Sequence, residues 1–343
     1  MSRPTIREVA KHADVSTQTV SRVLNNSPLV APQTRERVRA AMKTLGYEPN
    51  QVAQSLVTRK TRTLGYLVYD ITNPFYGQLV RGIEDAAFSQ GYDLFGGNSD
   101  SYYEKDILYM RAFRRKCVDG ILTTVSNPSH EMLDMWKHVS CPVVFLDKFF
   151  DSENFSYVTV NNREASKALI NYLLDLGHRH IGIVMPAEPT SVAVHERIEG
   201  FREALSDRGV PFDPSLTSVC HRQTEEGGYL ATYELFKRTS LQTALFCFND
   251  VIAIGAMRAI LEMGLKIPND VSLVGFDDIP IASMLRVPLT TVAQPIRLMG
   301  KAAVDLITER IKASPSLPHR HTVLDTKLVV RESAAPPRKH EKL

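Results

Sequence analysis

The 343-residue chain has few cysteines and no cysteine pair of the C-x-x-C type. Its four cysteines, Cys117, Cys141, Cys220 and Cys247, are far apart in the sequence. A zinc site or a disulfide framework needs closely or regularly spaced cysteines, so neither is indicated. We expect reduced thiols in a cytoplasmic protein.

The chain also lacks long apolar runs. No uncharged apolar stretch is long enough to span a bilayer, and no apolar segment of the signal-peptide type precedes the first helical pattern. Phosphate loops of the G-x-G-x-x-G or G-x-x-x-x-G-K-[S/T] kind are absent, and the acids and histidines form no ordered catalytic set. The sequence therefore disfavours a membrane protein, a secreted solute-binding protein and a nucleotide-using enzyme, and no cofactor or metal is expected.

Residues 5–25 predict two short helices joined by a tight turn. Thr5 caps the first helix, and Glu8 stands at the position that closes a capping box. Residues 13–15 form the turn, and Ser16 caps the second helix. The inward face of that helix is apolar at i, i+3 and i+4, namely at Val20, Val23 and Leu24. Its outward side chains suit base edges in a DNA major groove, namely Thr17, Gln18 and Arg22.

Two capped amphipathic helices also occur in soluble proteins that never bind DNA. The charge distribution distinguishes a DNA-binding unit from such an ordinary helix pair. Residues 1–60 contain ten Lys or Arg and four Asp or Glu, a net charge of +6. The whole chain carries +3, so the remainder carries −3. A basic segment on a slightly acidic body indicates a nucleic-acid-binding head attached to a different kind of domain.

A third helix, beginning at Pro32 and ending before Gly46, completes a small all-α helix-turn-helix head over residues 1–48. Residues 49–62 are a linker that contains one short helix. A helix of under about twelve residues is marginal alone in water, so we expect this one to need a partner or DNA to fold.

From residue 63 the sequence alternates short β-rich runs with helical segments, as in an α/β body. The first set has strands at 64–68, 92–95, 120–125, 143–147 and 157–160 and helices at 75–90 and 104–116. The second set has helices at 164–176, 197–208, 225–237 and 251–263 and strands at 181–185, 216–219, 243–248 and 271–276. Two βαβ sets predict two doubly wound parallel-sheet subdomains with a ligand crevice at the carboxyl ends of their strands.

The predicted body covers residues 63–333 and ends with a helix at 298–311 and a strand at 326–330. Its N-subdomain comprises about 63–161 and 291–324, and its C-subdomain about 162–290 and 325–333. Residues 334–343 are polar and proline-containing, so we expect a flexible tail. No apolar heptad occurs there, so no terminal coiled coil is expected to join dimers into tetramers.

Many short motifs occur in a fixed order along residues 5–333. They are V-S-x-x-T-V-S-R-V-L-N at 15–25, T-R-x-R-V at 34–38, L-G-Y-x-P-N at 45–50, A-x-S-L at 53–56, N-P-F at 73–75, V-D-G-I at 118–121, L-G-H-R at 176–179, N-D at 249–250, G-F-D-D at 275–278 and L-T-T-V at 289–292. In this order they resemble the lac repressor (LacI/GalR) family of bacterial transcription regulators. The resemblance implies a cytoplasmic, nucleoid-associated regulator, most commonly a repressor, with a body like a periplasmic sugar-binding protein.

Four positions depart from the family pattern. Asp14 replaces the usual Gly of the turn, and Ala31 replaces a capping Ser or Thr at the third helix. Asp tolerates the left-handed conformation better than most residues, so we expect the turn to persist. Gln54 replaces the commoner Arg of the linker, and Lys148 stands where Arg often follows Asp147.

The resemblance implies that the second helix lies in the major groove with Thr17, Gln18 and Arg22 at base edges. Gln suits adenine and Arg suits guanine. Further DNA contacts are implied for Thr5, Ser16, Ser21, Asn25, Thr34, Asn50 and Ala53. Leu56, by itself a core-type leucine of a short helix, becomes by resemblance a wedge that paired linker helices insert into the minor groove and that kinks the DNA.

The resemblance also maps an effector site onto Phe75, Asp147, Arg197, Asn249 and Asp277. Carboxylates, a guanidinium and an amide can donate to and accept from vicinal hydroxyls, while Phe75 offers an apolar face to a pyranose ring. This set favours a neutral sugar or sugar derivative, with a purine or another metabolite as the alternative. The remaining interpretations are a helix cap for either Asp and a structural ion pair for Arg197.

The partners implied are double-stranded operator DNA, a small-molecule effector and a second copy of the chain. A two-fold dimer places two second helices on a pseudo-palindrome. Closure of the body around the effector would change whether the two linkers pair, which couples the effector to DNA affinity. No membrane partner is expected.

Overall fold

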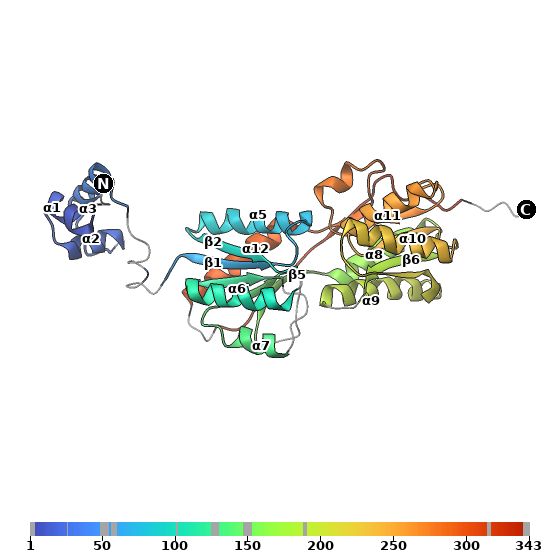
Figure 1. The fold of residues 1–343 in the computed structure, drawn as a ribbon, viewed down its shortest axis with the longest axis horizontal. Helices are drawn as coiled ribbons and strands as arrows, with labels where there is room; N and C mark the ends of the chain where they lie inside the picture. Colours follow the sequence, from blue (N-terminus) through green and yellow to red (C-terminus); the bar gives the residue numbers. More distant parts are fainter. Residues whose placement is uncertain are drawn as a thin grey trace, which may run out of the picture. The chain divides into compact units, whose positions relative to one another are not determined.

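The computed structural model describes residues 4–25, 27–48, 55, 60–100, 102–124, 130–146, 153–187, 191–313 and 317–338. The chain divides into two compact units, Met1–Thr61 and Arg62–Leu343, each with its own hydrophobic core (Figure 1). Of the linker predicted at 49–62, only Ser55 and residues 60–62 belong to the described residues.

The first unit contains three helices, α1 (Ile6–His12), α2 (Thr17–Leu24) and α3 (Pro32–Leu45). Their inward faces meet in a core whose fully buried members are Val9, Val20 and Val38. All three valines occupy positions of the apolar stripe that helical periodicity predicts. The two-helix pattern and the third helix of the head are therefore present.

The helix ends of this unit follow the sequence signals. Thr5 and Glu8 form the expected capping box, and the Ser16 side chain accepts from the N–H of Thr19. Asp14 in the turn has a φ of 50°, the left-handed conformation expected for the residue that replaces glycine. Ala31 makes no side-chain cap, so α3 begins only with the help of a proline in its first turn.

The second unit begins with a six-stranded parallel sheet. Its strands, in spatial order, are β11 (His321–Leu324), β5 (Ser156–Val160), β4 (Val143–Leu146), β3 (Gly120–Thr123), β1 (Thr63–Val68) and β2 (Asp93–Asn98). Side chains alternate between its faces: Leu122 and Val144 pack in one cluster, and their neighbours Ile121 and Phe145 pack in another.

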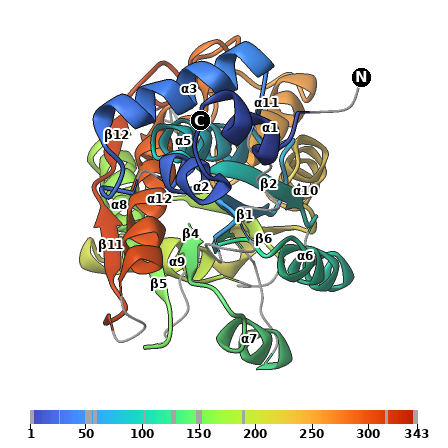
Figure 2. The same cartoon turned by 90° about the vertical axis from the view of Figure 1, so that its left-hand side faces the viewer.

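Helices cover both faces of this sheet (Figure 2). The cluster on the Leu122 side includes residues of α5 (Pro74–Ser89) and α12 (Ile296–Lys312). The opposite cluster, around Phe145, includes residues of α6 (Tyr103–Lys116) and α7 (His130–Lys137). Fully buried strands such as β3 and β4 read as continuous apolar runs for this reason.

A second parallel sheet has four strands in the order β7 (Thr217–Cys220), β6 (Ile181–Pro186), β8 (Ala244–Cys247) and β9 (Ser272–Val274). Phe246 packs with residues of α8 (Asn162–Asp175) and α9 (Val192–Asp207), and its neighbour Leu245 packs with α10 (Glu225–Arg238) and α11 (Asp250–Glu262). Figure 1 shows α10 and α11 on one side of β6 and α9 on the other. Short 3-10 turns lie at Pro214–Leu216 and Pro280–Ser283.

Between the two sheets the chain forms a two-stranded antiparallel ribbon of β10 (Thr291–Ala293) and β12 (Lys327–Val329). The sequence predicted β12 within its final strand but missed β10, β11 and α7. The predicted fold class, an all-α head and an α/β body with two doubly wound parallel sheets, is confirmed. Within the described residues, no helix combines the length and apolar character needed to cross a membrane.

Residues 334–338 correct the prediction of a flexible tail. The N–H of Ala335 donates to the Ser272 hydroxyl at 3.0 Å, and its carbonyl oxygen lies 3.0 Å from Nε2 of His178. Arg338 pairs with Asp270 at 2.8 Å. Composition suggested fraying, but side chains of the C-subdomain satisfy this backbone, so it lies along β9. Residues 339–343 lie outside the described residues.

Gly82 of α5 and Gly300 of α12 let the two helices approach closely, and Gly82 gives a stability prediction. A Cβ at Gly82 would collide with the Arg297 carbonyl oxygen, whereas a Cβ at Gly77 in the same helix would meet nothing within 4 Å. We expect Gly82→Ala to lower the free energy of unfolding by about 1–3 kcal/mol through overpacking. Gly77→Ala should raise it by up to about 1 kcal/mol through helix propensity. Urea denaturation of both variants checks this, and equal effects would contradict it.

Candidate functional site

The predicted DNA-reading residues lie on an exposed face of α2. Thr17, Gln18 and Arg22 are exposed, and Ser21 beside them is half-buried. Asn25, at the end of the helix, is exposed. Because Val20 and Val23 hold the other face of α2 in the core, the polar face is presented by a rigid element.

Two other predicted contacts serve the helices themselves. The Thr5 hydroxyl is engaged by Glu8 at 2.9 Å, and the Ser16 hydroxyl accepts from the Thr19 N–H at 3.1 Å. These caps fix the first turns of α1 and α2, where exposed N–H groups suit a phosphate oxygen. Thr34 is half-buried in the first turn of α3. Three further predicted contacts lie outside the described residues, namely Asn50, Ala53 and Leu56.

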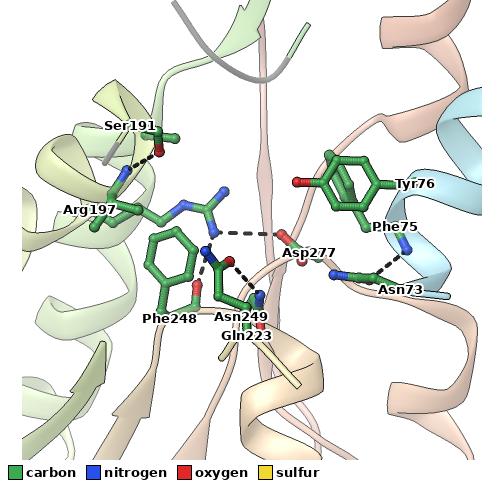
Figure 3. Close-up of a pocket in the computed structure, with 11 residues that line it drawn as sticks. Asn73, Phe75, Tyr76, Ser191, Arg197, Gln223, Phe248, Asn249 and Asp277 are labelled. Carbon is green, nitrogen blue, oxygen red and sulfur yellow. Dashed lines mark hydrogen bonds and ion pairs between the residues drawn. The ribbon is translucent and has the colours of Figure 1, made fainter. Parts of the chain in front are cut away.

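The second unit contains a cleft between its two sheets (Figure 3). The cleft lies beyond the carboxyl ends of β1, β6, β7, β8 and β9, where parallel α/β sheets bind ligands. The empty space between its side chains, including the open mouth, is about 340 Å³. It is lined by Asn73, Phe75, Tyr76, Ser191, Ala193, Val194, Arg197, Gln223, Phe248, Asn249 and Asp277.

Arg197 is the most constrained side chain of the cleft, and it is only 3% exposed. Its Nε donates to Oδ1 of Asn162 at 2.8 Å, and its Nη1 donates to the Phe248 carbonyl at 2.9 Å. Two aromatic rings pack against the guanidinium, with Cζ 3.7 Å from the centroid of Phe276 and 4.6 Å from that of Phe248. These contacts fix the guanidinium plane and leave its far edge directed into the cleft (Figure 3).

Asp277 faces Arg197 across the cleft. Its Oδ1 lies 3.6 Å from Nη1 of Arg197 and accepts from Nε2 of Gln294 at 2.8 Å. The residue is 4% exposed and has a φ of 125°, which is rare for a residue with a side chain. A buried carboxylate held beside a fixed guanidinium can accept hydrogen bonds from a ligand without first ordering its own side chain.

The remaining walls combine amides with aromatic rings. Oδ1 of Asn249 caps α11 by accepting from the Ile252 N–H at 2.9 Å, and its Nδ2 lies 3.5 Å from Oε1 of Gln223. On the opposite wall, the rings of Phe75 and Tyr76 pack edge to face, with their centroids 5.1 Å apart. The cleft therefore offers both donors and acceptors together with an apolar wall.

Four of the five predicted effector residues line this one cleft, namely Phe75, Arg197, Asn249 and Asp277. The fifth, Asp147, lies outside the described residues, as do Gln54 and Lys148. Arg197 does make an ion pair, as the structural interpretation required, but the pair lies at the cleft surface rather than away from it.

Sequence reasoning did not assign several residues of the cleft and its support, namely Asn73, Ser191, Gln223, Phe248 and Gln294. Tyr76 was considered as an aromatic that could reach the cleft, although a core role was favoured. One available signal was helix capping. Asn73 and Ser191 cap α5 and α9, just as Asn249 caps α11, and each cap follows the carboxyl end of a strand. Because α9 begins at Val192 rather than at 197 as predicted, its capping serine was overlooked.

Comparisons with known protein families match both units. Residues 5–50 match the model of bacterial regulatory proteins of the lacI family, and residues 170–334 match the periplasmic binding protein-like domain. The chain is 37% identical over 313 residues to the HTH-type transcriptional repressor PurR of Aliivibrio fischeri, covering 90% of this chain and 92% of that protein. It is 36% identical over 329 residues to the ribose operon repressor of Haemophilus influenzae, covering 96% and 98%.

Solved structures give the same result. The lac repressor dimer bound to operator and the anti-inducer ONPF has a TM-score of 0.86 at 27% identity, covering 97% of this chain and all of that chain. The complex of the transcriptional regulator CelR with cellobiose has a TM-score of 0.74 at 32% identity, with the same coverage. A LacI family regulator from Enterococcus faecium with bound ribose has a TM-score of 0.73 at 33% identity, covering 80% and 99%.

The exposed polar face of α2, the cleft and these relatives all indicate a DNA-binding regulator that is controlled by a small molecule. Relatives of similar length and 36–37% identity are transcriptional repressors, and the matched structures are DNA-binding regulators rather than enzymes. The chain therefore belongs to the lacI family of bacterial regulatory proteins and is an effector-controlled DNA-binding repressor.

Proposed function

We propose that the effector of this repressor is a neutral sugar that binds in the cleft between Arg197, Asp277 and the ring of Phe75. The single observation that carries the proposal is the arrangement around Arg197. The rings of Phe276 and Phe248 pack against its guanidinium, and its Nη1 lies 3.6 Å from Oδ1 of Asp277, so its polar edge is the part that can meet a ligand. The N–H groups at this edge donate hydrogen bonds, the Asp277 carboxylate accepts them and the Asn249 amide can do both, which matches the hydroxyls of a sugar.

A planar purine base would instead favour open aromatic faces on both of its sides for stacking. The faces of Phe248 and Phe276 that meet Arg197 are occupied, and Tyr76 is stacked on Tyr69 with ring centroids 6.0 Å apart and contacts Phe75 edge to face. A sugar needs only one apolar wall, which Phe75 and Tyr76 supply. Relatives whose printed names mention ribose or cellobiose support the same class.

On the DNA side, we propose a homodimer on a pseudo-palindromic operator, with Thr17, Gln18 and Arg22 of each copy at base edges. Ser16, Ser21, Asn25 and Thr34, with Thr5, serve the DNA backbone in this proposal, and Asn50, Ala53 and Leu56 of the linker complete the contacts. Effector binding changes operator affinity by the difference in effector affinity between two states of the body, commonly about 1–3 kcal/mol.

A thermal-shift panel tests the effector class. We expect the melting temperature of the full-length protein to rise with at least one of D-ribose, D-glucose and cellobiose and not with hypoxanthine or guanine, because a ligand at 100 times its Kd adds about 2.7 kcal/mol of stability. The matched control is Asn249→Ala, which removes a cleft amide and should abolish the shift. Stabilisation by the purine bases alone would contradict the proposal.

A further inference from the structure

One carboxylate behind the cleft stands out. Asp250, the residue after the cleft amide Asn249, is fully buried in the first turn of α11. Its Oδ1 accepts from the Thr291 hydroxyl at 2.6 Å, and its Oδ2 accepts from the Ile279 N–H at 2.9 Å. The N–H of Asp278 also donates to it. Among the described residues, no Lys, Arg or His forms an ion pair with Asp250.

A buried carboxylate without a paired cation is costly, so its position calls for an explanation. Burial raises the pKa of Asp250 to about 7, with a further rise from the charge of Asp278, while the three hydrogen bonds oppose that rise. The hydroxyl and the two N–H groups all donate, which is the pattern that an ionised carboxylate requires.

Two of the groups that Asp250 binds, the N–H groups of Asp278 and Ile279, belong to the loop that presents Asp277. In this loop Asp277 has a φ of 125° and Asp278 a φ of 56°, two successive unfavourable conformations. Such backbone persists only where surrounding contacts determine it fully. A Cβ at Gly275 would collide with Oδ1 of Asp250, so the carboxylate fills the space that the glycine leaves.

The same carboxylate also ties this loop to the ribbon between the two sheets. Thr291, its hydroxyl donor, is the first residue of β10. The Asp277 N–H donates to the Val292 carbonyl at 2.8 Å, so loop and ribbon are joined at adjacent points. Asp250 therefore connects the first turn of α11, the loop carrying Asp277 and the crossing strand.

We infer that Asp250 is a positioning residue of the effector site: its ionised carboxylate holds the 277–279 loop so that Asp277 faces the ligand, and the effector binds only to this state. The inference rests on the proposed function of the cleft. It implies that effector affinity depends on pH near neutrality.

The sign follows from the groups around Asp250. Asp278 faces it from the loop, the Cys247 thiol faces it from β8, and Arg331 reaches the loop by pairing with Asp278 at 2.6 Å. Protonation removes one acceptor and releases the loop. With its pKa raised to about 7, the carboxylate is ionised above neutrality and takes up a proton as the pH falls below it. The effector Kd should therefore rise about tenfold on acidification.

Calorimetric titration of D-ribose from pH 6 to pH 8 tests the inference in the full-length protein. We expect the wild-type Kd to rise about tenfold toward pH 6, and the Kd of Asp250→Asn to be at least tenfold weaker at pH 8 and independent of pH. Thr291→Val, which removes one donor, should keep the dependence but move its midpoint upward. Asp175→Asn, at an exposed carboxylate, should behave as wild type.

Hydrogen exchange of the 276–283 peptide, corrected for intrinsic rates, gives an effector-free readout. We expect faster exchange in Asp250→Asn at pH 8 and in the wild type at pH 6. If ribose does not bind the wild type, ribose is not the effector that the proposed function requires. The hydrogen-exchange rates still test the role of Asp250 in that case, because they need no effector. The inference would be overturned if Asp250→Asn had the same pH profile of Kd and the same exchange rate as the wild type. If that variant does not fold, the inference would be overturned by a Thr291→Val variant whose Kd has the same pH midpoint as the wild type.

Discussion

Arg197→Met should abolish the response to effector, with at least about a 100-fold rise in effector Kd. The variant loses the charge-assisted edge that faces the cleft, and each hydrogen bond to a charged group is worth about 1.5–3 kcal/mol. It also leaves Asp277 buried without its cation, so we expect the free energy of unfolding to fall by about 3 kcal/mol. Calorimetry and urea denaturation measure the two effects.

Two further variants separate binding from stability. Arg202→Met changes an exposed arginine of the same helix, so both quantities should stay near wild type. Adding Asp277→Asn to Arg197→Met removes the uncompensated charge, so it should restore part of the stability but none of the binding. If Arg197→Met bound effector within threefold of wild type, the guanidinium would not be part of the effector site.

Much of the fold could be predicted from the sequence because its strongest signals are local. The capping box at Thr5, the inward valines of α2 and the apolar runs of β3 and β4 each determine an element without help from distant residues. The elements that were missed lack such signals. Strand β11 alternates exposed and half-buried residues, and the three-residue β10 is stabilised by pairing with β12, 34 or more positions further along the chain.

The candidate site shows the same difference between residues with a local sequence signal and residues whose role depends on distant parts of the chain. Resemblance reached Phe75, Asn249 and Asp277, each of which stands shortly after a strand or at a helix cap, and Arg197 within α9. It did not reach Gln294, whose contact with Asp277 depends on the chain returning through the ribbon. The left-handed backbone of Asp277 and Asp278 is equally hidden in the sequence, because the hydrogen bonds that hold it come from Asp250 and the crossing strand.

Gln18→Ala and Arg22→Ala should each weaken specific operator binding by about 1–3 kcal/mol, or roughly 5- to 150-fold, because each removes a bidentate pair with one base. Both side chains are exposed on α2, so the free energy of unfolding should change by less than about 0.5 kcal/mol. Fluorescence anisotropy with the operator and with single-base variants of it measures the affinity and the base preference.

The salt dependence of binding separates base contacts from phosphate contacts. Gln18 is uncharged, so its removal should leave the slope of log K against log salt unchanged and relax the preference at one base position only. Arg39, exposed on α3, is the matched control: if it contacts phosphate, Arg39→Ala should lower affinity equally for all sequences and reduce the slope by about one. If Gln18→Ala weakened all sequences equally, α2 would position the head on the DNA backbone instead of reading bases.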